Sequence, residues 1–471
     1  MIKKGIYLVV GGLALIFLIS GTIDLNDLLN YKDQPVPDHV NTTGLDNVPI
    51  DNPMSDTLAT LGRVLFYDKQ LSSNNKVACA SCHLQSNAFG SPLVVDTGVN
   101  GLNLRHAMRL GNIRYSESTQ GFFWDERDTT LEQLATHPIQ NHIEMGYSGE
   151  LGDPTLLDLI TKMNGLSYYP LLFQFAYGDP TITEERIQKA LANFLRSIQS
   201  FDSKFDEGLN ESGGNDPLVL FSNFSSEENA GKTLFFSDPV LSGINRVGGG
   251  VGCFHCHSDV GRNVFHFLVE KKNNGIITEV DGSTVFNVTK APNLRNVFGQ
   301  SGELNGPLFH NGQASTFNQL LDHYDTAALT SNPNLDTRIT SNGKLNLTSE
   351  ERAQLESFMK TLTGNDIYLN PKWSNPFDAD GNPLVSPDLV YSGQEMNVSL
   401  FPNPASEYIY LSGDISEISE IVIYSMNGHE VWRQQLISNR LSISSLSTGM
   451  YFVVFVNESG QNVALKKIYK D

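Results

Sequence analysis

Two copies of Cys-x-x-Cys-His constrain this chain more than any other feature. The chain has 471 residues, and its four cysteines all lie in these motifs, Cys79-Ala80-Ser81-Cys82-His83 and Cys253-Phe254-His255-Cys256-His257. In this pattern the two cysteines form thioethers to a haem and the histidine is the proximal ligand of the iron. A zinc site of four cysteines would leave both histidines unexplained, and a redox dithiol would need a βαβ context that the sequence lacks. The sequence therefore predicts two covalently bound c-type haems.

The segments around the two motifs resemble each other. Four blocks recur in the same order, and each pair alone is a weak match. The paired blocks are 61–67 with 230–236, 71–72 with 241–242, 110–113 with 294–297, and 130–134 with 316–320. The ordered series predicts a duplicated haem unit.

Hydrophobic periodicity predicts mainly helical repeats, with the clearest helix over 184–201, an N-cap at Thr183 and a capping box that begins at Ser225. After about residue 364 the chain becomes rich in Pro, Asn and Asp, and short alternating runs follow from residue 398.

The expected fold class is therefore mainly α, with two cytochrome c-like haem domains in tandem and a small all-β sandwich after them. The expected parts are a signal peptide or N-terminal anchor at 1–21, haem domains at 40–210 and 217–365, a linker at 366–397 and the sandwich at 398–471. The formal net charge of -20 argues against nucleic acid and an anionic membrane surface as partners.

The ligand opposite each proximal histidine decides what each haem can do. No methionine lies between the second motif and residue 358, so the usual methionine ligand is missing there. Tyr324 follows Thr316 at the same offset as Pro138 follows Thr130 in the aligned repeats. Proline has no side-chain donor, so we expect the first haem to be open and the second to be closed by Tyr324. A ligand at His323, or no protein ligand, remains open as an alternative.

An open haem that cleaves peroxide needs a proton-transfer group on its distal side. Glu144, shortly after Pro138, is the best candidate, and His137 and His142 are alternatives. Trp124 is the one tryptophan of the haem region; from the residues alone it is more often a core residue than a charge relay.

Taken together, these residues resemble the bacterial dihaem cytochrome c peroxidases and their MauG-like relatives. The quoted matches, beyond both haem motifs, are Leu61-Gly62-Arg63, Leu65-Phe66-Tyr67-Asp68, Phe123-Trp124-Asp125-Glu126-Arg127, Pro138-Ile139-Gln140, Glu144-Met145-Gly146, Ala291-Pro292-Asn293-Leu294-Arg295-Asn296-Val297 and Phe309-His310-Asn311-Gly312-Gln313. The resemblance implies a peroxidatic first haem, an electron-transferring second haem, Trp124 between them and Glu144 as the acid–base group. Tyr324 falls where the peroxidases carry Met and the MauG-like proteins carry Tyr.

The chain departs from the family pattern at several positions. Val99 stands where peroxidases that need reductive activation carry a displaceable histidine, so we expect the first haem to be open when oxidised. The distal glutamine of the family falls on Leu134, with Gln133 one residue away, which leaves that role without an assigned residue.

The inter-haem calcium site of the family is the third departure. The resemblance implies calcium bound through the carbonyls of Asn305 and Pro307, but His106 stands where the family supplies an Asn side chain.

The C-terminal tail resembles the sorting domain of type IX secretion in Bacteroidetes-like bacteria. The matches are Leu400-Phe401-Pro402-Asn403-Pro404-Ala405, Ser447-Thr448-Gly449-Met450-Tyr451 and Lys466-Lys467. This resemblance, and the attachment of c-type haem outside the cytoplasm, imply export to the periplasm, the cell surface or the medium.

The function expected is reduction of hydrogen peroxide at the first haem, with electrons delivered through the second haem by a small donor protein such as a cytochrome c or a cupredoxin. MauG-like oxidation of a protein partner through high-valent haem is the alternative, and a plain electron-transfer cytochrome is a third reading that Pro138 argues against. The oligomeric state is left open, and a homodimer is one alternative.

Overall fold

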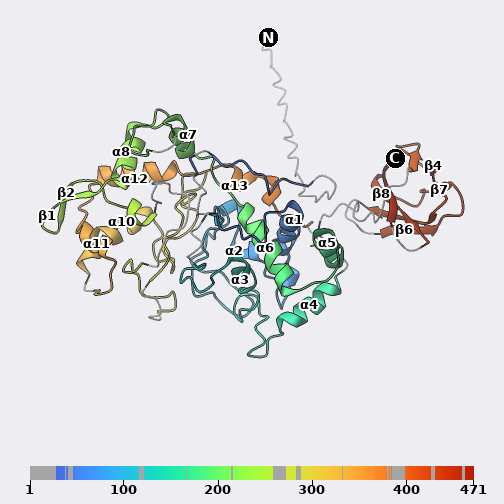
Figure 1. Ribbon diagram of the computed structural model, residues 1–471, viewed down its shortest axis with the longest axis horizontal. Coiled ribbons are helices and arrows are strands. Elements are labelled where there is room, and N and C mark those ends of the chain that lie inside the picture. The colour runs from blue at the N-terminus through green and yellow to red at the C-terminus, as the bar shows by residue number, and fades with distance from the viewer. Residues whose placement is uncertain are drawn as a thin grey trace, which may run out of the picture.

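The computed structural model describes residues 28–37, 39–40, 46–115, 121–166, 168–213, 216–257, 272–282, 288–330, 332–378, 381, 383, 398–425, 430–458 and 462–471. The predicted signal peptide or anchor at 1–21 lies outside these residues. Within them, no helix has the length and apolar character needed to cross a membrane. Figure 1 shows a helical body, and the strands β3 to β9 form a second body at one end.

Helices dominate the part of the chain that carries the two motifs. Within the described residues of this part, one hairpin pairs β1 (Pro239–Ser242) with β2 (Asn245–Gly249). The helices are α1 (Asp56–Tyr67), α2 (Cys79–Cys82), α3 (Leu131–Thr136), α4 (Leu156–Asn164), α5 (Tyr168–Tyr177), α6 (Glu184–Ser197), α7 (Lys204–Glu211), α8 (Ser226–Phe236), α9 (Phe254–His257), α10 (Phe317–Thr326), α11 (Thr337–Asn342), α12 (Ser349–Lys360) and α13 (Asp366–Leu369).

The same helix crossing occurs twice, once for each motif. In the first half α1 packs across α6, and in the second half α8 packs across α12. A glycine lies at each crossing. A Cβ on Gly62 would lie 2.0 Å from the carbonyl oxygen of Ala190, and a Cβ on Gly231 would lie 1.9 Å from that of Gln354. The two glycines occupy matching places in the repeated blocks 61–67 and 230–236, so the duplication extends to how the helix backbones approach each other.

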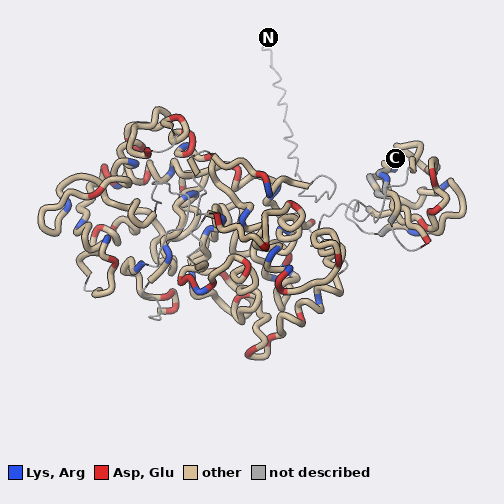
Figure 2. Tube along the Cα trace, viewed as in Figure 1, with Lys and Arg blue, Asp and Glu red and all other residues tan. Residues whose placement is uncertain are grey.

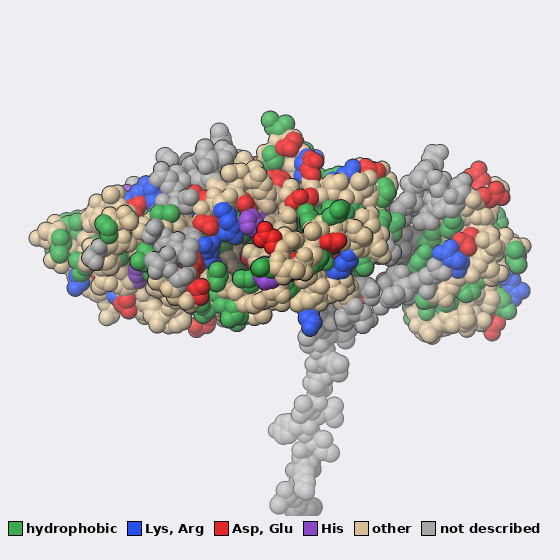
Figure 3. All heavy atoms as spheres, turned by 90° about the horizontal axis from the view of Figure 1, so that it is seen from below, with side chains coloured by type: hydrophobic (Ala, Val, Ile, Leu, Met, Phe, Trp, Pro, Cys, Tyr) green, Lys and Arg blue, Asp and Glu red, His purple; other side chains and the backbone are tan. Residues whose placement is uncertain are grey.

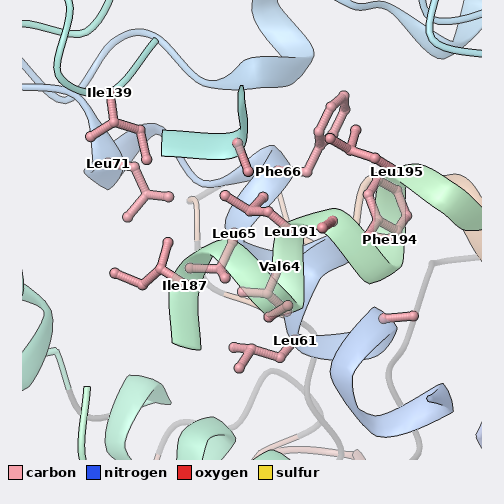
Figure 4. Close-up of a cluster of buried hydrophobic side chains, with 14 of the residues drawn as sticks. Leu61, Val64, Leu65, Phe66, Leu71, Ile139, Ile187, Leu191, Phe194 and Leu195 are labelled. Carbon is pink, nitrogen blue, oxygen red and sulfur yellow. The ribbon is translucent and has the colours of Figure 1, made fainter. Parts of the chain in front are cut away.

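Each half has its own hydrophobic core. Figure 4 shows part of the first, in which Leu61, Val64 and Leu65 of α1 lie beside Ile187 and Leu191 of α6. These residues recur at helical spacing, which places them on one face of each helix. Burial of one such side chain stabilises the fold by about 1.5–3 kcal/mol. The α1–α6 pair therefore forms the packed support for the first motif, whose helix α2 contacts α1.

The predicted helix starts are confirmed, and one predicted end is wrong. The side chain of Thr183 accepts a hydrogen bond from the backbone of Arg186, and Ser225 forms a capping box. The helix predicted over 184–201 ends at Ser197. Beyond it, the backbone N–H of Ser200 donates to Oδ1 of Asn112 at 2.8 Å, and Nδ2 of Asn112 donates to the Ser200 carbonyl at 3.1 Å. A distant side chain thus takes the backbone groups that one more helical turn would have used.

The stretch 366–397, expected as a linker, begins with a packed segment. Trp373 is buried, and its Nε1 donates to the Ser197 hydroxyl at 3.2 Å. The Tyr67 hydroxyl donates to the Trp373 carbonyl at 2.6 Å, and Nε of Arg63 donates to the Ser374 carbonyl at 2.7 Å. The chain therefore returns from the second half and packs on α1 and α6 of the first.

Two antiparallel sheets make up the C-terminal body, in agreement with the predicted all-β tail. Buried side chains of both sheets belong to one hydrophobic cluster; examples are Ile409, Leu441, Ile423 and Phe455. That the two sheets form a sandwich stays a prediction. The orders are β3-β4-β7 and β6-β5-β8-β9, formed by β3 (Val398–Phe401), β4 (Tyr408–Gly413), β5 (Ile418–Ser425), β6 (Glu430–Gln435), β7 (Arg440–Ser442), β8 (Gly449–Asn457) and β9 (Asn462–Lys470).

Charged side chains are spread over the molecule. Figure 2 shows Asp and Glu positions interspersed with Lys and Arg positions along the described parts of both bodies.

The glycines at the two helix crossings give a test of the duplicated packing. Gly62→Ala or Gly231→Ala should each lower the free energy of unfolding by about 1–3 kcal/mol, because the added methyl group forces the helices apart. Denaturant unfolding of the haem-loaded protein measures the loss. Gly248→Ala is the matched control, since no heavy atom lies within 4 Å of a Cβ built there. Equal stability of all three variants would contradict the crossing.

Candidate active site: two cavities lined by the repeated motifs

The first motif opens onto a cavity in the first half of the chain. The helix α2 is a single turn, and Cys79, Cys82 and the His83 that follows it all line this cavity. Nδ1 of His83 donates a hydrogen bond to the Phe89 carbonyl at 3.0 Å. Burial lowers the pKa of His83, so the ring is neutral and its Nε2 keeps a lone pair. A histidine prepared in this way is suited to bind iron, because the carbonyl fixes both its tautomer and its orientation.

The second motif repeats this arrangement in a second cavity. Cys253, Cys256 and His257 line it, and Nδ1 of His257 donates to the Pro292 carbonyl at 3.1 Å. Burial lowers the pKa of His257 to about 4. All four motif cysteines are free of disulfides, so their thiols are available for thioether bonds. The donor set of each cavity therefore fits a c-type haem.

The two cavities differ in size. The cavity at the first motif has a volume of about 440 Å³, and the cavity at the second motif has a volume of about 190 Å³. Figure 3 shows one face of the molecule, hollowed near its middle, where Lys or Arg, Asp or Glu, and His side chains gather.

Charged residues line part of the first cavity. The two carboxylate oxygens of Asp125 accept one hydrogen bond each, from Arg105 and from Arg127, both at 2.9 Å. Although burial raises the pKa of Asp125, these two guanidinium groups hold it below its ordinary value. Nε of Arg105 also donates to Glu279 at 3.1 Å. This network fixes two cations at the wall of the first cavity.

Of the candidates for the acid–base group, some line the first cavity and others do not. Pro138, Leu134 and Glu144 line it, as does His137, whose Nδ1 lies 3.2 Å from Asp128. His142 is not among the lining residues and pairs instead with Asp153 at 2.8 Å.

Gln133 points away from the cavity. Its Oε1 accepts hydrogen bonds from the backbone and hydroxyl of Thr129, so it supports the start of α3. Among the described residues at the distal wall, Leu134 is apolar and Glu144 carries the carboxylate.

Glu144 is held in place by its backbone. Its N–H donates to Oδ1 of Asn141 at 3.1 Å, and its carbonyl accepts from the N–H of Val99 at 3.0 Å. Gly98 allows this contact, since a Cβ there would lie 2.1 Å from the Ile143 carbonyl oxygen. Burial raises the pKa of Glu144, and the positive charges of Arg127, His137 and Arg105 offset part of that rise. A carboxyl group with a raised pKa is a better proton acceptor than an ordinary glutamate, as an acid–base group requires.

The second cavity contains the tyrosine predicted from the repeat alignment. Tyr324 of α10 lines it, and burial raises the pKa of its hydroxyl. His323 is absent from the lining residues, and its Nε2 donates to the Asn274 carbonyl at 2.7 Å. The geometry therefore brings Tyr324, and not His323, to the cavity; coordination by Tyr324 stays a prediction.

Six residues from three stretches of the chain line both cavities. Trp124 is among the residues that line both, its Nε1 donates to the His106 carbonyl at 2.9 Å, and its own carbonyl accepts from the N–H of Lys290 at 2.8 Å. Burial lowers the pKa of Lys290 to about 8, opposed by Glu126. The residues shared by the two linings are His106, Ala107, Met108, Arg109, Trp124 and Lys290.

One residue at the expected calcium site is a poor ligand for that ion. The side chain of His106 offers only nitrogen, its Nδ1 donates to the Leu93 carbonyl at 2.9 Å, and burial lowers its pKa to about 4. Binding through the carbonyls of Asn305 and Pro307 stays a prediction. The carbonyl of Asn305 accepts a hydrogen bond from Asn87 at 3.0 Å, while Pro307 lines the second cavity. Calcium takes several oxygen ligands, so the replacement of an amide oxygen by an imidazole removes one of them.

Two shared residues, Arg109 and Lys290, were not found from the sequence. Arg109 directly precedes the repeated block 110–113, and Lys290 directly precedes a stretch matched to the family. Their type and position alone do not distinguish a cation buried between two cavities from one in solvent.

Comparisons with known proteins agree with this geometry. Residues 56–213 match a family model described as di-haem cytochrome c peroxidase, and residues 399–471 match one described as a secretion system C-terminal sorting domain. The chain is 26% identical to the methylamine utilization protein MauG of Methylophilus methylotrophus, over 68% of this chain and 87% of that protein. It is 27% identical to the cytochrome c551 peroxidase of Nitrosomonas europaea, over 66% and 82% respectively.

A solved structure shows the same fold. It is a MauG-like protein associated with microbial copper homeostasis, 27% identical to this chain, with a TM-score of 0.56. The match covers 73% of this chain and 99% of that one.

The two motifs give a direct test of cofactor load. Changing both Cys79 and Cys82 to Ser should remove one covalent haem, and changing both Cys253 and Cys256 should remove the other, because serine cannot form the thioethers. Intact mass under denaturing conditions counts the haems on each variant. A variant that keeps the mass of the unchanged protein would contradict attachment at that motif.

Proposed function

Because the chain belongs to the bacterial di-haem cytochrome c peroxidase and MauG family and ends in a secretion sorting domain, we propose that it is an exported peroxidase that reduces hydrogen peroxide at the first cavity. Electrons reach this site through the second cavity from a small donor protein. The observation that carries the proposal is the difference between the two cavities: Pro138 and Glu144 line the first, and Tyr324 lines the second.

The reaction needs electrons and protons in equal number. Hydrogen peroxide takes up two electrons and two protons, its O–O bond breaks, and two water molecules form. When bound, the haem supplies the iron at which this bond is cleaved. Glu144 accepts a proton from the near oxygen of peroxide and returns it to the departing oxygen, which leaves as water.

The surroundings of Glu144 suit this proton transfer. Leu134 gives the distal wall an apolar surface, which limits the water that could compete for the carboxylate. Arg105 and Arg127, held by Asp125, supply positive charge close enough to oppose the rise in the Glu144 pKa. Burial and the two guanidinium groups therefore shift the pKa of Glu144 in opposite directions.

Trp124 is the proposed route for electrons between the haems. Its indole ring lines both cavities and is fixed by hydrogen bonds at its Nε1 and at its carbonyl. Support comes from this position, since an aromatic ring in contact with both cavities shortens the distance that each electron must cross.

A second candidate function is the oxidation of a protein partner, as in the MauG-like relatives. The residue that favours it is Tyr324, because a buried phenol that binds the second iron would close that haem to exogenous ligands. Val99 agrees with it, since no histidine is present there to close the first haem. Addition of peroxide without a donor separates the two functions: a peroxidase turns over only with its donor, and the MauG-like enzyme keeps the oxidising equivalents until the protein substrate arrives.

The sorting domain at 399–471 indicates export and placement at the cell surface or in the medium. We propose that the donor or protein substrate is met there or in the periplasm.

Replacement of the acid–base group tests the first cavity. Glu144→Gln should lower kcat/KM for peroxide by about 10²–10⁴-fold, because the amide cannot accept the proton. In the unchanged protein, kcat/KM should fall as the pH drops through the raised pKa of Glu144, and this acid limb should vanish in the variant. Steady-state kinetics over a pH series measures both effects. The exposed Glu150→Gln is the control, and a Glu144→Gln variant with the rate and pH profile of this control would rule out the role.

Replacement of the proposed second ligand tests the other cavity. Tyr324→Phe should change the optical and EPR spectra of the second haem, because the phenyl ring offers no donor to iron. The neighbouring His323→Gln should leave those spectra unchanged, since His323 is bonded to Asn274 outside the cavity lining. An unchanged spectrum in Tyr324→Phe would remove Tyr324 as the ligand.

A further inference from the structure

Two of the residues that line both cavities are cations, Arg109 and Lys290, and their hydrogen bonds differ. Nζ of Lys290 donates to the Gly121 carbonyl at 2.7 Å. Arg109 has a buried Nε without a hydrogen-bond partner, and its Nη2 lies 3.5 Å from the Asn293 carbonyl, at the outer limit of a hydrogen bond. Among the described residues no carboxylate lies within 4.0 Å of its guanidinium. Arg109 is therefore a cation that lines both cavities and receives few hydrogen-bond acceptors and no counter-ion from the described residues.

The electrostatic surroundings of Arg109 sharpen this point. Burial lowers its pKa to about 10, and the group that most offsets this is the Tyr368 phenol, whose own pKa burial raises. Arg109 thus stays charged at neutral pH beside a neutral phenol. The other neighbour, His106, has a pKa near 4 and is neutral too. A charge removed from water without a counter-ion is costly, and none of the described residues supplies an anion to Arg109, so we expect a ligand to supply it.

The anion that fits is a carboxylate of the cofactor. Arg109 lines both cavities, and a haem carries propionate side chains at its rim. A guanidinium group matches a carboxylate with two parallel N–H donors. The free Nε and the weakly bonded Nη2 are the pair that such contact uses.

The backbone makes room for this arginine at Gly90. A Cβ on Gly90 would lie 2.7 Å from Cγ of Arg109, so the aliphatic part of Arg109 passes over a residue that has no side chain. Gly90 follows Phe89, whose carbonyl holds His83. In the second repeat the matching position is Asn293, an uncharged residue. One cation is thus built into the segment between two otherwise similar haem units.

We propose that Arg109 is the cation between the two haems, binding a haem carboxylate, and that the chain holds no calcium ion there. It takes the role that the family resemblance assigns to calcium, for which the side chain of His106 is poorly suited. The proposal rests on haem attachment and not on the peroxide reaction, so it stands or falls independently of the proposed peroxidase activity.

Redox titration of the haem-loaded protein tests the cation. A nearby positive charge favours the reduced haem, so Arg109→Gln should lower the midpoint potentials. We expect at least a tenfold fall in the ratio of reduced to oxidised haem at fixed potential, which is 59 mV for one electron. Arg109→Lys keeps the charge and should keep most of the potential. Equal potentials in Arg109→Gln and the unchanged protein would overturn the proposal.

Calcium analysis provides the second arm and needs no variant. Elemental analysis of the purified protein should find no stoichiometric calcium, and treatment with EDTA should leave the optical spectrum and the potentials unchanged. One calcium per chain whose removal shifts the potentials would overturn the proposal, even if Arg109→Gln failed to fold.

Discussion

Each haem cavity depends on one hydrogen bond, from Nδ1 of the motif histidine to a backbone carbonyl. His83 bonds to Phe89 and His257 to Pro292, at 3.0 and 3.1 Å. This bond decides which nitrogen faces the cavity and therefore which wall is proximal and which is distal. The candidate distal residues then differ between the cavities: Pro138 and Glu144 line the first, and Tyr324 lines the second.

The difference between the distal walls arises from where one helix ends. α3 and α10 start in the same way, with a threonine N-cap at Thr130 and at Thr316. α10 continues for ten residues and brings Tyr324 to its cavity, but α3 stops after six. Pro138 has no backbone N–H to donate to the carbonyl four residues earlier, so it cannot continue the hydrogen bonding of the helix. The same proline thus lacks a side-chain donor and ends the helical hydrogen bonding, and the loop that carries Glu144 follows it.

The sequence predicted the features that local patterns control. These include the capped starts of α6 and α8, the repeated blocks and the all-β tail. It did not predict features that depend on distant contacts. The end of α6 is set by Asn112, and the packing of Trp373 on Ser197 brings part of the expected linker into the first core. The contacts of Arg109 could not be predicted either, because the sequence does not show whether an arginine side chain faces solvent or a cofactor.

Charge balance between the cavities connects these observations. If electrons pass through Trp124 as we propose, its ring becomes briefly positive, and Arg109 and Lys290, which line the same cavities, would raise the energy of that state. The indole N–H donates to a backbone carbonyl, which is too weak a base to take the proton and relieve the charge. An anion paired with Arg109 would cancel part of the repulsion. A carboxylate from the cofactor in that place would both satisfy the buried cation and lower the barrier to electron transfer through Trp124.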